Sequence, residues 1–208
     1  MRNTAIYPGT FDPITFGHID VIKKSLKIFD KVVVAAAENI NKDYLFTIDE
    51  RVEIIKDSLF KDLKLSRNRI LVIPFNTLTI NLCKKYKANV IIRGLRAVSD
   101  FEYEFQLAGM NKKLNEKIET IFMMSDVENQ IISSKFVKEI ARLDGKTDRF
   151  LTKTTVKKLN SKIETIFLMS DVENQIISSR FVKEIASLGG NINRFVTKST
   201  VKMLKNKI

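Results

Sequence analysis

The run between Tyr7 and Asp20 combines glycines, prolines and polar residues in a pattern that suits phosphate binding. Gly9 and Gly17 carry no side chain, so the backbone at both positions can lie close to a ligand. His18, the only histidine of the chain, stands at the start of an expected helix. The free N–H groups and partial positive charge of a helix N-terminus favour phosphate. Two roles stay open for His18: a phosphate contact, or a helix cap without catalytic duty.

Ser133 and Ser134 form a second candidate phosphate-binding position, because they open another expected helix. Their hydroxyls and the adjoining N–H groups suit the β- and γ-phosphates of a nucleotide. A helix cap needs only one serine, and capping is compatible with phosphate binding. A metal centre is disfavoured, because a single histidine lacks partners and no Cys/His cluster has the spacing of a structural zinc site.

Short apolar runs alternate with segments of helical periodicity along the first two-thirds of the chain. The pattern predicts strands over 5–7, 31–37, 70–75, 89–92 and 118–124, and helices over 17–29, 47–60, 78–86, 100–114 and 133–143. Continuous apolar strands joined through helices are typical of a parallel sheet covered on both faces. We therefore expect a Rossmann-like, doubly wound, five-stranded α/β fold. Ligands of such sheets bind beyond the carboxyl ends of the strands.

Length and composition favour one domain with an appendage, since the chain has 208 residues, 44% of them hydrophobic and 29% charged. The net charge of +12 suggests anionic partners, although a lysine-rich surface without function would give the same balance. We expect neither nucleic acid nor a membrane as partner, because no nucleic-acid-binding motif is present and the apolar runs are too short to span a bilayer. The N-terminus lacks a signal-peptide pattern and the lone Cys83 suits a reducing compartment, which predicts a cytoplasmic protein.

The C-terminal part of the chain is an internal repeat. Residues 114–158 recur as 159–203, with about three positions in four identical. The first copy contains the fifth strand and fifth helix of the expected sheet, so the second is a spare set of the same parts. We therefore expect a domain over 1–158 and a tandem copy over 159–208. The spare copy would form an extra packed layer, exchange with a neighbouring subunit, or stay disordered.

Three sequence blocks resemble one known family. Thr15-x-Gly17-His18 resembles the (H/T)xGH signature of the nucleotidyltransferase superfamily. The run from Tyr7 to Ile22 is similar to its phosphopantetheine adenylyltransferase branch, and so are residues 92–104 and 132–139. The blocks keep the order and spacing of that branch and together cover about residues 1–158.

The resemblance implies adenylyl transfer from ATP to 4′-phosphopantetheine, which yields dephospho-coenzyme A and pyrophosphate. It also implies Mg²⁺ that arrives with ATP, and a homo-oligomer that is a hexamer of two stacked trimers. Such transfer depends on positioning and electrostatic stabilisation. Two alternatives stay open: a nucleotidyltransferase with another acceptor, such as nicotinate mononucleotide or glycerol phosphate, and a catalytically degenerate nucleotide-binding protein. The first is disfavoured because those branches usually carry His where this chain has Thr15.

The resemblance also implies the roles of individual residues. His18 would donate to the α-phosphate, and the Thr10 hydroxyl would bridge nucleotide and acceptor, with the Phe11 backbone close to ATP. Lys42 and Arg93 would hold the acceptor phosphate, and with His18 and Thr10 they form the expected catalytic set. Thr79 would contact the pantetheine arm. The remaining ATP-binding positions are Gly94, Leu95, Arg96, Glu104, Asn129, Gln130, Ile131, Ile132, Ser133, Ser134 and Lys135.

The chain departs from the family pattern at three places. Lys135 stands where Ser or Thr is usual, which keeps positive charge but loses a hydroxyl, and Asn129 stands where an aromatic residue is common. After the fifth helix, residues 145–147 lack the apolar residue of the family, whereas Gly190-Asn191-Ile192 keeps it. That detail favours the second copy as the one in the sheet. The short link to the preceding helix favours the first copy, which we expect there.

Overall fold

The computed structural model describes residues 3–38, 43–96, 98–130, 132–163, 179–197, 200–201 and 203. The chain divides into two compact units, residues 1–165 and 166–208, which we describe one at a time.

The first unit is built on a five-stranded sheet whose strands are all parallel, in the order β3-β2-β1-β4-β5. The strands are β1 (Thr4–Gly9), β2 (Lys31–Ala37), β3 (Ile70–Phe75), β4 (Val90–Leu95) and β5 (Glu119–Met124). The chain moves outward from β1 to β3 and then returns to place β4 on the other side of β1. Ligands of such sheets bind where the strand order reverses, which is the crevice between β1 and β4.

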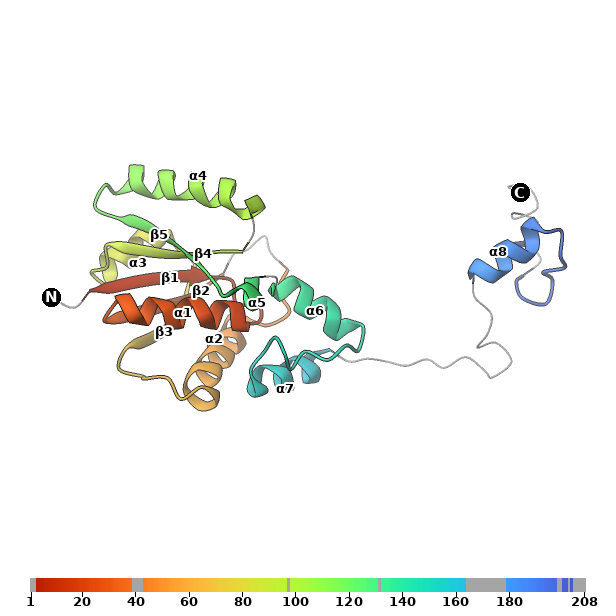
Figure 1. Cartoon of the computed structure of the whole chain (residues 1–208), viewed down its shortest axis with the longest axis horizontal. Coiled ribbons are helices and arrows are strands. Elements are labelled where there is room, and N and C mark those ends of the chain that lie inside the picture. The colour runs from red at the N-terminus through yellow and green to blue at the C-terminus, as the bar shows by residue number, and fades with distance from the viewer. Residues whose placement is uncertain are drawn as a thin grey trace. The chain divides into compact units, whose positions relative to one another are not determined.

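Helices cover both faces of this sheet, which confirms the doubly wound α/β fold expected from the sequence (Figure 1). They are α1 (Phe16–Ile28), α2 (Ile48–Asp57), the π-helical turn η1 (Ser58–Asp62), α3 (Thr79–Lys85), α4 (Val98–Leu114), α5 (Val127–Gln130), α6 (Ser134–Arg142) and α7 (Lys153–Lys162). α3 and α4 lie on one face, and α1, α2, α6 and α7 lie on the other. Within the described part of the chain, no helix is long and apolar enough to cross a membrane.

The central strands are apolar throughout because both of their faces are buried. Successive side chains of a strand point to opposite faces. Thus Ile6 and Val33 pack in the core under α3, whereas Tyr7 and Val34 pack in the core under α1 and α2. This two-sided burial fixes the strand register, in which β1 and β4 pair at Ala5 with Val90 and at Ile6 with Ile91.

The structure differs from the sequence-based expectations at the ends of several elements. β4 was expected to end at Ile92 but continues to Leu95, because its last residues pair with Phe122–Met124 of β5. The helix expected to run to about Phe60 changes to π-helical geometry after Asp57. α5 and α7 were not expected; α7 is largely polar and depends on tertiary contacts of Thr155 and Leu159.

The first copy of the repeat supplies β5, in agreement with the expectation from connectivity. Its counterpart strand in the second copy, over residues 164–169, lies outside the described residues. In the second unit the structure describes α8 (Ser179–Ser187) and the turn that follows it. There the Gly190 N–H donates to the Ile185 carbonyl at 2.8 Å, the same bond that Gly145 makes with Ile140 after α6.

Candidate active site

A cavity of about 520 Å³ opens at the carboxyl ends of β1 and β4, where the strand order reverses. It is lined by Tyr7, Pro8, Gly9, Thr10, Phe11, Asp12, Thr15, Gly17, His18, Val21, Arg93, Gly94, Leu95, Arg96, Glu104, Ser125, Ile132, Ser133, Ser134, Lys135 and Lys138. The cavity walls therefore come from the loop after β1, the start of α1, the end of β4, α4, and the start of α6.

The loop after β1 is shaped by a close approach of its own residues. Phe11 has a φ of 50°, in the left-handed region that few non-glycine residues adopt. Its ring folds back onto Gly9, where a Cβ would lie 2.8 Å from Phe11 Cζ. A side chain at position 9 would therefore displace the Phe11 ring. The turn presents Thr10 to the cavity.

The His18 ring is held in one tautomer by Thr15, the residue that caps α1. His18 Nδ1 accepts a hydrogen bond from the Thr15 backbone N–H at 3.1 Å and lies 2.9 Å from Thr15 Oγ1. A backbone N–H can only donate, so Nδ1 carries no proton and the neutral ring keeps its proton on Nε2. The ring also packs edge-on against Phe11, with centroids 5.1 Å apart. Thr15 and Phe11 thus hold the Nε2–H donor of His18 in place at the N-terminal, positive end of α1.

The His18 ring is neutral at physiological pH. Its pKa is lowered from 6.5 to about 3, because burial disfavours the charged ring and Arg96 adds electrostatic repulsion. A neutral donor keeps its hydrogen bond to an anionic oxygen without a proton transfer. The ring can therefore donate a hydrogen bond to an anionic oxygen through Nε2–H.

We expect the lowered pKa of His18 to make the folded chain sensitive to acid. Below pH 6.5 the unfolded chain protonates His18, whereas the folded chain does so only near pH 3. The stability contributed by neutral His18 is complete above pH 6.5 and is lost as the pH falls toward 3, at up to about 1.4 kcal/mol per pH unit. Urea unfolding between pH 7 and pH 4.5 should show a steeper loss for the natural chain than for His18→Gln. Parallel curves for the two chains would contradict this account of the ring.

Gly17 allows a second segment to approach the start of α1. A Cβ at this position would lie 3.0 Å from the Asn129 carbonyl oxygen and 3.5 Å from that of Ile132. The backbone around residues 129–132 therefore packs directly against the helix N-terminus. The glycine of the Thr15-x-Gly17-His18 motif shapes one wall of the cavity through this contact.

Arg93 and Glu104 form a two-pronged ion pair across the cavity wall. Arg93 Nη2 lies 2.5 Å from Glu104 Oε1, and Nε lies 2.6 Å from Oε2. Nη1 donates to the Pro8 carbonyl at 3.2 Å. Both side chains are mostly buried, so the pair is well shielded from water. The guanidinium is thereby fixed at the end of β4, beside the loop that follows β1.

Asp12 connects three parts of the site. Its carboxylate accepts hydrogen bonds from the Leu45 and Phe46 backbone N–H groups, each at 3.0 Å, and from Lys138 Nζ at 2.7 Å. The residue is 2% exposed. Asp12 therefore ties the β1 loop to the segment before α2 and to α6.

Arg51 of α2 is a buried cation beneath the same loop. Its Nη1 donates to the Thr10 carbonyl at 2.8 Å and to the Ala37 carbonyl at 2.7 Å. The guanidinium stacks over the Tyr44 ring at 4.0 Å. Within the described part of the chain, no carboxylate pairs with it. Arg51 therefore joins the ends of β1 and β2 and adds positive charge below the cavity.

Replacing Arg51 with Met should destabilise the chain by about 2 kcal/mol, because two buried carbonyl groups lose a charged donor. Urea unfolding at neutral pH measures this loss. Arg67→Met is a matched control, since the exposed Arg67 only stacks over the Phe60 ring. Equal destabilisation by the two substitutions would show that the buried bonds of Arg51 do not hold the loop.

The structure brings most of the residues expected from the sequence to this cavity and leaves some outside it. Thr79 and Asn129 do not line it, although the Asn129 backbone supports its wall. Lys42 and Ile131 lie outside the described residues, as does the side chain of Gln130. The expected residues that line it are Thr10, Phe11, His18, Arg93, Gly94, Leu95, Arg96, Glu104, Ile132, Ser133, Ser134 and Lys135.

Sequence reasoning missed several residues of the site. Arg51 carried a usable signal, because it shares the stripe of Ile54 and Ile55 on α2 at helical spacing. Asp12 stood within the first motif without an assigned role. Lys138 gave no signal, because its partner lies more than a hundred residues away in the chain.

The cavity is suited to a polyanion. Its cationic side chains outnumber its carboxylates, and both carboxylates already have cationic partners, Asp12 with Lys138 and Glu104 with Arg93. The N-termini of α1 and α6 add partial positive charge. Together these groups favour a phosphate-bearing ligand.

Comparisons with known proteins agree with this site. The model of the cytidylyltransferase-like family matches residues 6–140. A protein of Vibrio parahaemolyticus described as a nicotinate-nucleotide adenylyltransferase has the same fold, with a TM-score of 0.57 and 19% identity over 79% of this chain and 98% of that one. Fold and site thus define a nucleotidyltransferase.

Two relatives identify the branch. The phosphopantetheine adenylyltransferase of Pelagibacter ubique (strain HTCC1062) is 68% identical over 156 residues, which are 75% of this chain and 95% of the relative. That of Roseobacter denitrificans is 47% identical over 147 residues, covering 71% of this chain and 89% of the relative. The chain belongs to the phosphopantetheine adenylyltransferase family.

Proposed function

We propose that this chain transfers the adenylyl group of ATP to 4′-phosphopantetheine and releases pyrophosphate, giving dephospho-coenzyme A. The observation that carries the proposal is the fixed Nε2–H donor of His18, set at the N-terminus of α1 in a cationic cavity. That arrangement occurs in a chain that is 68% identical to a phosphopantetheine adenylyltransferase.

The reaction is an in-line displacement at the α-phosphorus of ATP. An oxygen of the acceptor phosphate forms the new bond to phosphorus, while the bond to the β-phosphate oxygen breaks and pyrophosphate leaves. Negative charge builds on the oxygens around the α-phosphorus, and His18 donates a hydrogen bond to one of them. The Thr10 hydroxyl bridges nucleotide and acceptor, held in place by the bond from Arg51 to its carbonyl.

Arg93 binds the acceptor phosphate in this proposal, together with Lys42. Glu104 fixes the guanidinium of Arg93 before substrate arrives, so little side-chain freedom is lost on binding. The Glu104 carboxylate engages Nε and Nη2 of Arg93, and the remaining guanidinium N–H groups donate to the phosphate. Thr79 contacts the pantetheine arm beyond the cavity.

The nucleotide lies along the end of β4 and the start of α6. Residues 94–96 and 129–132 hold the adenosine, with the Phe11 backbone beside it. Ser133 Oγ accepts from the Phe136 N–H at 3.1 Å, and Ser134 Oγ donates to the Pro13 carbonyl at 2.7 Å. Because both hydroxyls have local partners, the N–H groups of α6 and the Lys135 ammonium bind the β- and γ-phosphates.

Magnesium arrives as the complex with ATP and is part of the substrate. Among the described residues, no group of three or more His, Cys, Asp or Glu could hold a metal ion. The cavity carboxylates Asp12 and Glu104 are engaged in ion pairs. Mg²⁺ bound to substrate phosphates and water needs no protein cage.

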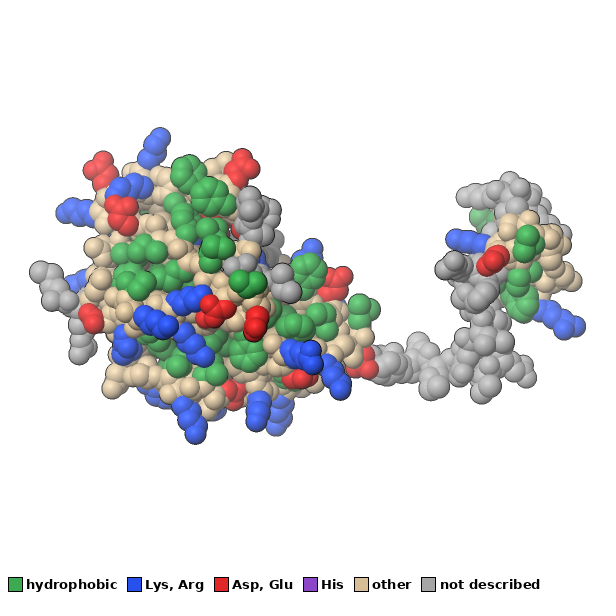
Figure 2. Space-filling view, viewed as in Figure 1, with side chains coloured by type: hydrophobic (Ala, Val, Ile, Leu, Met, Phe, Trp, Pro, Cys, Tyr) green, Lys and Arg blue, Asp and Glu red, His purple; other side chains and the backbone are tan. Residues whose placement is uncertain are grey.

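The enzyme acts in the cytoplasm as a homo-oligomer, a hexamer in this proposal. Support comes from α4, which leaves large hydrophobic side chains exposed on both of its sides: Phe101 and Phe105 on one, and Tyr103, Met110 and Leu114 on the other. Figure 2 shows hydrophobic side chains gathered over α4. Several large hydrophobic side chains exposed on one helix are typical of a protein interface.

The proposal is tested by offering ATP and Mg²⁺ with three acceptors in parallel: 4′-phosphopantetheine, nicotinate mononucleotide and glycerol phosphate. Pyrophosphate release with the first alone is the expected result. Release with one of the others alone would reassign the acceptor. Binding of ATP without release for any acceptor would support the degenerate nucleotide-binding alternative.

A further inference from the structure

The second copy of the repeat keeps the residues through which α6 is held on the sheet. Ser134 Oγ donates to the Pro13 carbonyl at 2.7 Å, and Lys138 Nζ lies 2.7 Å from Asp12 Oδ2. Val137 is 1% exposed in the core of the first unit. The second copy has the same residue types at the matching positions, Ser179, Val182, Lys183 and Ala186 for Ser134, Val137, Lys138 and Ala141.

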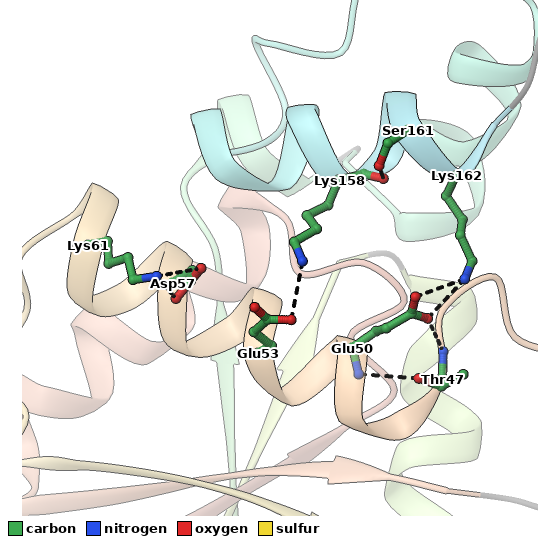
Figure 3. A network of polar contacts seen from close by, with 8 residues as sticks. All are labelled: Thr47, Glu50, Glu53, Asp57, Lys61, Lys158, Ser161 and Lys162. Atoms are coloured by element: carbon green, nitrogen blue, oxygen red, sulfur yellow. Dashed lines mark hydrogen bonds and ion pairs between the residues drawn. The ribbon is translucent and has the colours of Figure 1, made fainter.

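The residue types that hold α7 recur in the same way. The Thr155 hydroxyl shares a 2.8 Å hydrogen bond with that of Ser58, and Thr154 Oγ1 donates to Asp62 at 2.8 Å. Lys162 Nζ lies 2.8 Å from Glu50 Oε1, an ion pair between α7 and α2 shown in Figure 3. The matching residues of the second copy are Thr200, Ser199 and Lys207.

The second copy lacks one exposed ion pair and part of one core side chain, since Val196 matches the buried Leu151. Lys158 pairs with Glu53 at 3.2 Å on the surface, and the second copy has Met203 there. An exposed ion pair contributes little to stability. The first copy should therefore bind this surface with a free energy only slightly more favourable than that of the second copy.

The second copy also forms the same local structure. α8 (Ser179–Ser187) matches α6 (Ser134–Arg142) at the repeat offset. Asp144 and Gly189 follow the two helices with φ of 58° and 75°. Phe150 and Phe195 N–H groups each donate at 3.0 Å, to the carbonyls of Thr147 and Ile192. Over residues 179–197, the second copy thus has the local structure of its counterpart in the first copy.

We propose that residues 178–208 can replace residues 133–163 on the sheet domain of the same chain. The surface they would take is the one now filled by α6 and α7. β5 would stay in the sheet, and residues 133–177 would become a tether that is long enough for the exchange. Attachment to the same chain gives the second copy a high effective concentration, which favours it over a copy from another molecule.

The exchange would change the phosphate-binding wall, because Arg180 would stand in place of Lys135. Arginine presents a planar fork of donors to phosphate, whereas lysine presents a point charge. The chain would therefore hold two versions of the same nucleotide-binding wall. This consequence rests on the proposed function, whereas the exchange itself does not.

The exchange is tested in the full chain with Val137→Asp, Val182→Asp and the double variant. A carboxylate at Val137 excludes α6 from the core, so the second copy takes its place and the unfolding temperature of the sheet domain stays near that of the natural chain. Val182→Asp leaves the first copy docked and the temperature unchanged. The double variant has no usable copy and should unfold about 10 °C lower. Val137→Asp unfolding as low as the double variant would overturn the proposal.

A second measurement identifies the docked copy directly. Added to Val137→Asp, the substitution Arg180→Glu should weaken ATP binding about tenfold by calorimetry, since it reverses a charge beside the phosphates. Unchanged ATP binding in a stable Val137→Asp chain would overturn docking of the second copy. The difference in unfolding temperature between Val137→Asp and the natural chain should not depend on protein concentration, although an oligomer's absolute temperatures do. A Val137→Asp chain that loses its stability relative to the natural chain on dilution would contradict exchange within one chain.

Discussion

His18→Ala should lower kcat for adenylyl transfer about 10²–10³-fold, because it removes the one imidazole donor aimed at developing charge in the cavity. The affinity for ATP should change little, since the cationic side chains and helix N-termini that bind the triphosphate stay in place. Steady-state pyrophosphate release gives kcat, and calorimetry gives the ATP affinity. A fall in kcat of less than threefold would remove His18 from the mechanism.

Thr15→Ala is the matched control for His18→Ala. It deletes the Oγ1 contact with the ring but keeps the backbone N–H that fixes the tautomer. We expect a fall in kcat well below that of His18→Ala. An equal loss would mean that the threonine hydroxyl, and not the imidazole, carries the effect.

Arg93→Met should have the second large effect, on both stability and activity. The substitution leaves the Glu104 carboxylate buried without its ion-pair partner, at a cost of about 3 kcal/mol in the free energy of unfolding. It also removes the guanidinium proposed to bind the acceptor phosphate, so kcat/KM for 4′-phosphopantetheine should fall about 100-fold or more. Urea unfolding and initial rates at varied acceptor concentration measure the two effects.

The double variant Arg93→Met/Glu104→Gln separates these two effects. Neutralising Glu104 removes the unpaired charge, so stability should largely return while kcat/KM for the acceptor stays low. Recovery of both quantities together would show that Arg93 acts on the fold alone.

The sheet and the position of its ligand site were predictable from the sequence because they depend on local patterns. Continuous apolar runs such as 31–37 reflect burial on both faces, and the residues after each strand necessarily gather at one edge. The tautomer of His18 was not predictable, because it depends on a hydrogen bond from the Thr15 backbone. Its lowered pKa was not predictable either, because it depends on burial of the ring and on Arg96, which follows β4.

Long-range polar contacts account for most of what the sequence did not reveal. The helical spacing of Arg51 could have indicated its burial, but its hydrogen bonds to the Thr10 and Ala37 carbonyl groups could not be predicted. α7 has too few apolar residues for a helical pattern and depends on Ser58, a residue far away in the chain. Such contacts leave no periodic trace in a single sequence.

The most direct test of the central claim is mass-spectrometric detection of dephospho-coenzyme A after incubating the full chain with ATP, Mg²⁺ and 4′-phosphopantetheine. We predict one dephospho-coenzyme A formed for each pyrophosphate released. A folded chain that binds ATP yet forms no dephospho-coenzyme A would contradict the assignment as an adenylyltransferase.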